Sequence, residues 1–189
     1  MCRGDGFRVY AVASLSVNDD PIYGPATPDT GNLPDFAALS DEVLNRTAIA
    51  YVCSPANPQG AVADRAYWER LIGLAEKHDF QIFADECYAE IYRDAPPVGA
   101  MQVARDMGAD PERVLIFHSL SKRSNLPGLR SGFCAGGPQS IAKICSLRAY
   151  AGAPVAGPIQ AVSAAAWAGD DHVVENRALY HQKSKIAAD

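Results

Sequence analysis

Three short apolar runs in the middle of the chain constrain its fold more than any other feature. They are TAIAYVC, FQIFAD and RVLIFHS, at residues 47–53, 80–85 and 113–119. Between the first two runs, apolar residues recur with the spacing of one helical face: Ala66, Tyr67, Leu71, Leu74 and Ala75. A second helical stretch, at about 99–107, separates the second run from the third. This β-α-β-α-β order predicts parallel strands joined by right-handed crossovers.

The segments on either side of these runs extend the prediction. The run SGFCAGG, at 131–137, follows the third strand too closely for a helix between them, so we expect a loop and an antiparallel fourth strand. After Pro138 the chain is helical, with a Gly/Pro-rich break and a final polar helix at about 171–187. Before the first run we expect one weak strand, near residues 7–15, and then a loop rich in Pro, Gly and Asp. The fold class is therefore α/β with a mostly parallel sheet.

Composition and charge exclude several classes of protein. The 189 residues are 48% hydrophobic, enough for one sizeable core, and the formal net charge is -5 with no basic stripe, so we expect no nucleic-acid partner. No run of about 18 apolar residues and no signal peptide is found, which predicts a cytoplasmic protein without a membrane partner. The five cysteines form no CxxC pair, and buried free thiols are favoured over disulfides or metal ligands. We predict no metal site.

Polar residues follow each of the first two runs, where ligands bind in parallel α/β sheets. After the first comes SPANPQG, in which Asn57 lies between prolines; an ordinary turn is the alternative interpretation. After the second comes ADECYAEIY, in which Asp85 needs a cationic or hydrogen-bonding partner and Tyr88 lies one helical turn further on. A helix cap is the alternative role for Asp85. We assign Glu86 and Glu90 to a solvated face.

The third run leads into HSLSKRSNLPGLRSG, which gathers hydroxyls, a lysine and an arginine. Ser119, Ser121, Lys122 and Arg130 lie within twelve residues, on a loop whose glycines allow it to fold about one anion. A surface position is the usual fate of a lysine. Lys122, however, follows a buried strand directly and would be partly desolvated, a condition that favours an amine acting as nucleophile or base.

One ligand, pyridoxal phosphate, suits these groups together. It needs a lysine for its aldehyde, an acid for its ring nitrogen, donors to its phenolic oxygen, and a cation with hydroxyls for its phosphate. In that order, the residues that match these needs are Lys122, Asp85, Tyr88 with Asn57, and Arg130 with Ser119.

The order of the motifs S-P-x-N-P-x-G, D-E-x-Y, S-x-S-K and G-L-R-x-G, and the intervals between them, resemble the class I and II aminotransferases of the fold-type-I pyridoxal-phosphate enzymes. The resemblance implies a three-layer α/β/α large domain. It also implies that Lys122 holds the cofactor and moves the substrate proton, and that Asp85 pairs with the ring nitrogen. Tyr88 and Asn57 would bind the phenolic oxygen, and Asn57 also the substrate carboxylate.

The same resemblance implies phosphate ligands and a homodimer. Ser119 and Arg130 match the phosphate ligands, and Ser121 is a weaker candidate. Family members act as homodimers on small-molecule amino acids and 2-oxo acids. The stretches GNLPDFAALSDEVL, SPANPQGAVADRAYWERL and FHSLSKRSNLPGLRSGF look most like the succinyldiaminopimelate aminotransferases and their aspartate-aminotransferase-like relatives, which suggests lysine biosynthesis.

The resemblance begins at about residue 7, and family members are longer than this chain. We therefore expect residues 1–189 to be part of the pyridoxal-phosphate-binding large domain, with 170–189 as the start of the helix toward a small domain. The arginine that binds the substrate carboxylate and the glycine-containing helix start at the phosphate lie outside the resemblance. Phe7 is a weak candidate for the aromatic residue that stacks on the cofactor.

Two other functions remain open at this point. The chain could be a pyridoxal-phosphate-binding module without turnover, such as a sensor, a scaffold or an inactive remnant. A structural domain without cofactor would leave the convergence of the strand-end residues unexplained.

Overall fold

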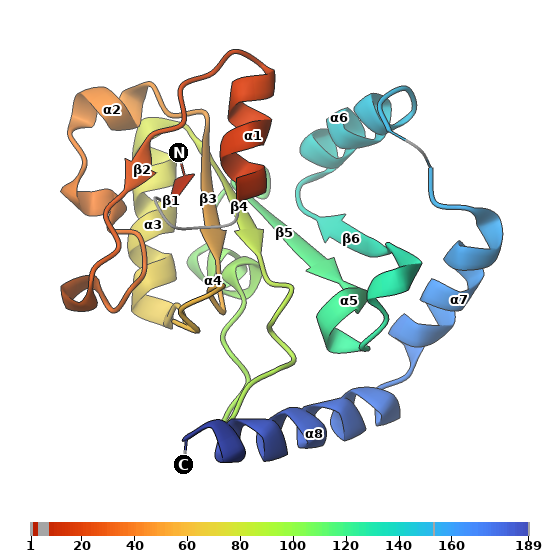
Figure 1. Cartoon of the computed structure of the whole chain (residues 1–189). Helices are drawn as coiled ribbons and strands as arrows, with labels where there is room; N and C mark the ends of the chain where they lie inside the picture. Colours follow the sequence, from red (N-terminus) through yellow and green to blue (C-terminus); the bar gives the residue numbers. More distant parts are fainter. Residues whose placement is uncertain (1, 4–7, 153, 189) are drawn as a thin grey trace.

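A four-stranded sheet forms the centre of the computed structural model, which describes residues 2–3, 8–152 and 154–188. Its strand order is β3-β4-β5-β6 (Figure 1). The first three strands are parallel and the fourth is antiparallel to its neighbour, as predicted. The bounds are Ile49–Cys53 for β3, Gln81–Asp85 for β4, Val114–Ser119 for β5 and Gly132–Ala135 for β6.

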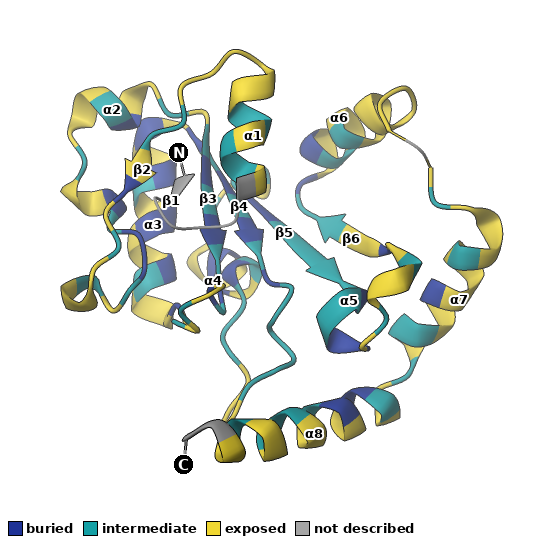
Figure 2. Ribbon diagram, in the orientation of Figure 1, coloured by how far each residue is buried: buried dark blue, intermediate teal, exposed yellow. Residues whose placement is uncertain are grey.

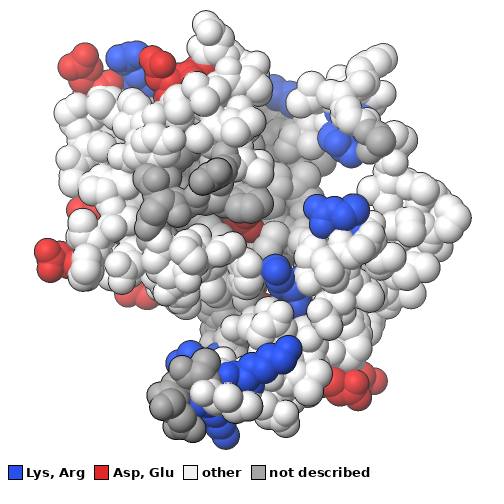
Figure 3. Space-filling model, in the orientation of Figure 1, with Lys and Arg blue, Asp and Glu red and all other residues white. Residues whose placement is uncertain are grey.

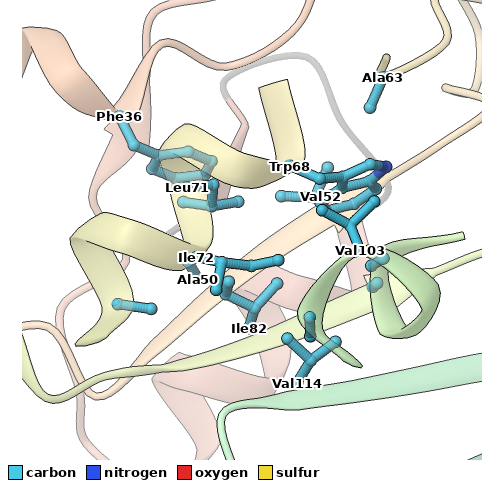
Figure 4. Close-up of a cluster of buried hydrophobic side chains, with 14 of the residues drawn as sticks. Phe36, Ala50, Val52, Ala63, Trp68, Leu71, Ile72, Ile82, Val103 and Val114 are labelled. Carbon is cyan, nitrogen blue, oxygen red and sulfur yellow. The ribbon is translucent and has the colours of Figure 1, made fainter. Parts of the chain in front are cut away.

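Two helices cover one face of this sheet and enclose the main core. They are α3, Arg65–His78, and α4, Ala100–Met107, both close to their predicted bounds. The Asp64 side chain accepts a hydrogen bond from the Tyr67 amide and so fixes the start of α3. Figure 4 shows Trp68, Ile72 and Val103 packed with Val52 and Ile82 of the sheet. Burial of these side chains is the main force that holds the two helices on the strands.

The opposite face carries α1, Arg8–Ser16, where we had predicted a weak strand. That prediction is wrong. The Tyr10 ring stacks on Tyr51 of β3, with centroids 4.9 Å apart and planes 10° from parallel. Tyr51, Phe83 and Phe117 form a row of contacting aromatic rings across the three parallel strands. Packing on this aromatic surface outweighs the weak strand propensity of the segment. With helices on both faces, the arrangement is three-layered.

The segment between α1 and β3 is mostly loop, as predicted. It contains the short strand β2, Tyr23–Gly24, which pairs in parallel with β1, Cys2–Arg3. Two 3-10 turns follow, and then α2, Asp41–Asn45, whose start is capped by Ser40. Leu33, Phe36 and Leu44 from this segment are buried and extend the core past β3.

The chain beyond β5 is helical and more exposed. A four-residue helix, α5, and a 3-10 turn lie between β5 and β6, where we had predicted a loop. Three longer helices then follow, as predicted; Figure 2 shows that much of their surface is exposed. The bounds are Leu120–Arg123 for α5, Pro138–Arg148 for α6, Gly157–Ala168 for α7 and Asp171–Ala188 for α8.

Cys53, Cys87, Cys134 and Cys145 are free thiols, as predicted. The first three are half-buried rather than buried, and Cys145 is exposed, because its side chain lies on the solvent side of α6. Within the described ranges, none of the helices combines the length and the apolar character needed to cross a membrane.

Candidate functional site

The loops that follow β3, β4 and β5 bring three of the predicted residues together. The Asn57 Nδ2 atom donates a hydrogen bond to the Tyr88 hydroxyl, at 3.4 Å. The Lys122 Nζ atom lies 5.5 Å from the centroid of the Tyr88 ring. Residues from three separate parts of the chain therefore meet around one tyrosine, at the edge where the parallel strands end.

Asn57 is presented on a tightly held turn. The peptide bonds Ser54–Pro55 and Asn57–Pro58 are both cis, and Gly60 has a φ of 71°, which favours glycine. The Gly60 amide donates to the Ala56 carbonyl at 2.7 Å, which closes the turn. Asn57 is exposed. The turn interpretation and the binding interpretation are thus compatible.

Asp85 ends β4 with both carboxylate oxygens engaged. One oxygen accepts a hydrogen bond from the Cys87 amide at 3.2 Å. Residues 87–90 form a turn and not a helix, so the helix-cap alternative is wrong, and Asp85 stabilises this turn instead. The other accepts from the Tyr10 hydroxyl at 2.6 Å. Burial, and then the Asp85 carboxylate, raise the pKa of Tyr10 far above its usual value, so this hydroxyl stays protonated and donates. Tyr10 was missed from the sequence, because the segment that carries it was read as a strand.

Glu86, which we had assigned to a solvated face, is buried with 7% of its surface exposed. One carboxylate oxygen lies 3.1 Å from His118 Nε2, and the other accepts from the Ala100 amide at 2.8 Å. The first amides of α4 have no partner within the helix, and this carboxylate supplies one. Glu90 is more exposed but pairs with Arg177 at 3.1 Å. The prediction is wrong for Glu86, because its partners come from β5 and α4.

Lys122 lies in α5, directly after β5, and is half-buried. The Ser119 hydroxyl caps α5 by accepting from the Ser121 amide at 3.1 Å, and it donates to the Ser121 hydroxyl at 2.9 Å. In the part of the chain that the structure describes, no carboxylate lies within ion-pair distance of the Lys122 amine. The amine lies over the Tyr88 ring.

Arg130 also lies on the connection between β5 and β6, but its guanidinium bonds a backbone carbonyl and not the Ser119 hydroxyl. Its guanidinium is exposed and donates to the Pro127 carbonyl at 3.1 Å. The connection then passes very close to β5: a Cβ atom added at Gly132 would lie 2.3 Å from the His118 carbonyl oxygen. Only glycine allows β6 to pair at this point. Arg130 is thereby held near the end of β5.

Cavities lie beside two parts of the described chain. One, of about 740 Å³, lies between the loop at 55–62 and the loop at 88–97, and both Asn57 and Tyr88 line it. Ser184 of α8 closes one side. The other, of about 440 Å³, lies between the loop at 29–37 and α3, and none of the predicted site residues lines it. Asp85, Lys122 and the predicted phosphate ligands do not line the first cavity either, so that cavity adjoins only the Asn57 and Tyr88 side of the site.

Figure 3 shows a hollow between the sheet and the C-terminal helices, with basic side chains on the side of those helices. This distribution of charge suits a ligand with an anionic group. The described residues contain no cluster of three or more His, Cys, Asp or Glu side chains that could hold a metal ion.

Comparison with known proteins gives one consistent family. Residues 16–189 match the family model "Aminotransferase class I and II". A transaminase of Streptomyces rimosus named 4-dedimethylamino-4-oxo-anhydrotetracycline transaminase OxyQ is 35% identical over 73% of this chain and 38% of its own length. An LL-diaminopimelate aminotransferase of Nitratidesulfovibrio vulgaris (Miyazaki F) is 30% identical over 95% of this chain and 46% of its own.

Solved structures agree with this result. The crystal structure of an aminotransferase from Neisseria meningitidis superposes with a TM-score of 0.87 at 40% identity, over 94% of this chain and 45% of that one. The chain thus spans less than half the length of these relatives. The mostly parallel sheet and its helices match the corresponding part of that fold.

Proposed function

This chain belongs to the class I and II aminotransferases, and on that premise we propose that it carries the pyridoxal-phosphate site of an enzyme that transfers an amino group from an amino acid to a 2-oxo acid. One observation carries the proposal: Asn57 and Lys122, from the segments that follow β3 and β5, both lie against Tyr88, from the segment that follows β4. An amine beside an amide and a phenol is suited to a carbonyl compound with a polar ring.

The chemistry of the side chains fits this cofactor. Asp85 offers a carboxylate at a strand end, the partner that a protonated ring nitrogen needs. The hydroxyls of Ser119 and Ser121, with Arg130 on the same connection, are donors of the kind that bind phosphate. When bound, pyridoxal phosphate supplies a ring that withdraws electrons from the substrate's α-carbon.

The roles of the individual residues follow from their positions. Lys122 would hold the cofactor's aldehyde carbon through Nζ and later carry the substrate proton on the same atom. Asp85 would hold the proton on the ring nitrogen, and the Tyr10 hydroxyl would keep the Asp85 carboxylate in place. Tyr88 and Asn57 would donate to the phenolic oxygen, and Asn57 would also bind the substrate carboxylate.

The finer assignments are part of the same proposal. The diaminopimelate name of the relative supports a substrate with a long, charged side chain, in lysine biosynthesis. A homodimer is supported by apolar side chains that are more than half exposed on α1 and α8, such as Val12 and Leu179. The cytoplasmic location remains a prediction.

The cofactor-loaded chain tests this proposal through its visible absorbance when an amino acid is added. We expect the Lys122→Ala variant to lack the visible absorbance band of protein-bound pyridoxal phosphate. We expect the Asp85→Asn variant to bind the cofactor but to suppress the spectral change on addition of amino acid, because an unprotonated ring nitrogen withdraws electrons poorly. An unchanged band in Lys122→Ala would refute the site. A wild-type chain that binds the cofactor but shows no spectral change with any amino acid would favour a binding module without turnover.

A further inference from the structure

We propose that Asn176, in α8, is a positioning residue for Lys122 and fixes the short helix that carries the amine. The role of Lys122 in this inference rests on the proposed function. The two residues lie 54 positions apart in the sequence. The inference depends on three features: the hydrogen bonds of the Asn176 amide, the second attachment of α5, and the exposure of the rest of α8.

The Asn176 side chain bonds the backbone of the lysine itself. Its Nδ2 atom donates to the carbonyl oxygen of Lys122 at 2.9 Å and to that of Arg123 at 3.2 Å. A helix of four residues leaves its last carbonyls without partners of its own. Asn176 supplies these partners from outside, and the orientation of the Lys122 peptide then depends on α8.

The neighbouring residue, Arg123, attaches α5 to the same part of the chain. Its guanidinium donates to the Ala166 carbonyl at 2.9 Å, pairs with Asp170 and lies 4.8 Å from the centroid of the Trp167 ring. The His172 ring bonds the Ser124 hydroxyl at 2.8 Å. The end of α7, the start of α8 and the residues between them therefore hold α5 in place.

The position of Asn176 in α8 is unusual for an amide. In the part of α8 whose side chains the structure describes, only Val173 and Asn176 are buried, with 3% and 8% of their surfaces exposed. Burial of an amide is unfavourable unless it is hydrogen-bonded, and an apolar residue of similar size would leave the Lys122 and Arg123 carbonyls without this donor. The specific feature that the amide adds is the pair of hydrogen bonds to the lysine segment. This points to geometry, and not packing, as its role.

The test compares the full chain with Asn176→Leu, which removes the donor without changing charge or size greatly, and with Asn176→Gln, which keeps an amide. The matched control is Gln182→Leu, the same kind of replacement at an exposed position of α8. Without cofactor, hydrogen exchange is measured for residues 120–126, where the amides of Ser124 and Leu126 donate to the Leu120 carbonyl. We expect about a tenfold faster exchange in Asn176→Leu, partial recovery in Asn176→Gln and no change in Gln182→Leu.

A second measurement gives a readout that a packing role would not move. After brief exposure to pyridoxal phosphate and reduction with borohydride, the modification of Lys122 is compared with that of the exposed Lys143 in the same molecule. We expect the ratio to fall about tenfold in Asn176→Leu and to return in part in Asn176→Gln. A lower melting temperature with an unchanged ratio and unchanged exchange over 120–126 would overturn the inference.

If Asn176→Leu fails to fold, Asn176→Ala replaces it, because it also removes the donor but introduces no larger side chain into the contact. Faster exchange over 120–126 in that variant supports the inference, and unchanged exchange overturns it. Failure of the proposed function would give a different result: in the wild-type chain, pyridoxal phosphate would modify Lys122 no faster than Lys143. In that case the exchange measurement still decides whether Asn176 fixes α5.

Discussion

The two halves of this chain are held together in different ways. The continuous buried core runs from Leu33 to Val114 and joins α3 and α4 to the parallel strands. Beyond β5, the described residues contain only two buried apolar side chains, Leu120 and Val173. Asn57 and Asp85 thus lie on a body fixed by burial, whereas Lys122 lies where that body meets a segment fixed by hydrogen bonds. Single polar residues should therefore affect the position of the Lys122 amine more than they affect the positions of Asn57 and Asp85.

The polar attachments of α8 to the rest of the chain support this comparison. Besides Asn176, the Arg177 guanidinium pairs with Glu90 and lies 4.2 Å from the centroid of the Tyr92 ring. The His181 ring bonds the Tyr92 carbonyl at 2.7 Å. These contacts reach the 88–97 loop, which carries Tyr88. Both the lysine and the phenol are thus supported by the same helix.

The largest expected effect comes from the core. Ile82→Ala removes a side chain that is fully buried in β4, and we expect it to lower the free energy of unfolding by about 2–5 kcal/mol. The matched apolar truncation in the other half, Leu179→Ala, should change it by about 0.5 kcal/mol or less, because that side chain is 53% exposed. Urea unfolding followed by circular dichroism measures both. Equal losses would contradict the division into two differently stabilised halves.

A smaller effect is expected where the two halves meet. Glu86→Ala removes the partner of His118 and of the Ala100 amide, and we expect it to cost about 1–3 kcal/mol of unfolding free energy, since it leaves a buried donor unsatisfied. Glu86→Gln keeps an acceptor for the Ala100 amide and should cost less. The same urea experiment distinguishes the two variants. If Glu86→Ala were as stable as the wild type, the contact would not be a structural link.

The polar attachments of α8 should each be weaker still. Arg177→Met keeps an apolar side chain but loses the pair with Glu90 and the contact with Tyr92, and we expect a loss of about 1 kcal/mol or less. Its clearer result should be faster hydrogen exchange in the 88–97 loop. Unchanged exchange there would show that α8 does not support the loop.

The smallest effect is expected in the alkylation rates of the cysteine thiols, which are measured on the chain without any substitution. Burial, and then the Asp85 carboxylate, raise the pKa of Cys87, so its thiol stays protonated at pH values where an ordinary cysteine is partly thiolate. We expect the exposed Cys145 to be alkylated before Cys87 at pH 8. Cys87 should react slowly at that pH, and its rate should increase as the pH rises. Peptide mass spectrometry gives the order. If Cys87 reacted first, the end of β4 would be more open than described.

Much of the fold follows from local patterns, because the strands of a parallel sheet are buried on both faces and so read as apolar runs. The segment of α1 is the exception. Its helix depends on Tyr10 stacking on Tyr51, a contact that no neighbouring residue predicts. The short α5 was likewise missed, since the Ser119 cap that starts it is formed by the same hydroxyl that we assigned to a phosphate.

The candidate site divides in the same way. Asn57, Tyr88 and Lys122 could be found because each follows an apolar run, and the topology then brings them together. Tyr10 and Asn176 could not be found. Their contacts with Asp85 and Lys122 span 75 and 54 residues, and neither lies in a motif or at a strand end. Supporting residues of this kind are determined by the packing of distant helices.

We propose that Lys122, and not another amine, takes the cofactor. The direct test is to incubate the chain with pyridoxal phosphate, reduce it with borohydride and locate the added mass by peptide mass spectrometry. We expect one modification at Lys122, with little at the other four lysines, Lys77, Lys143, Lys183 and Lys185. Modification spread evenly over the five lysines, or its absence from Lys122, would contradict the proposal.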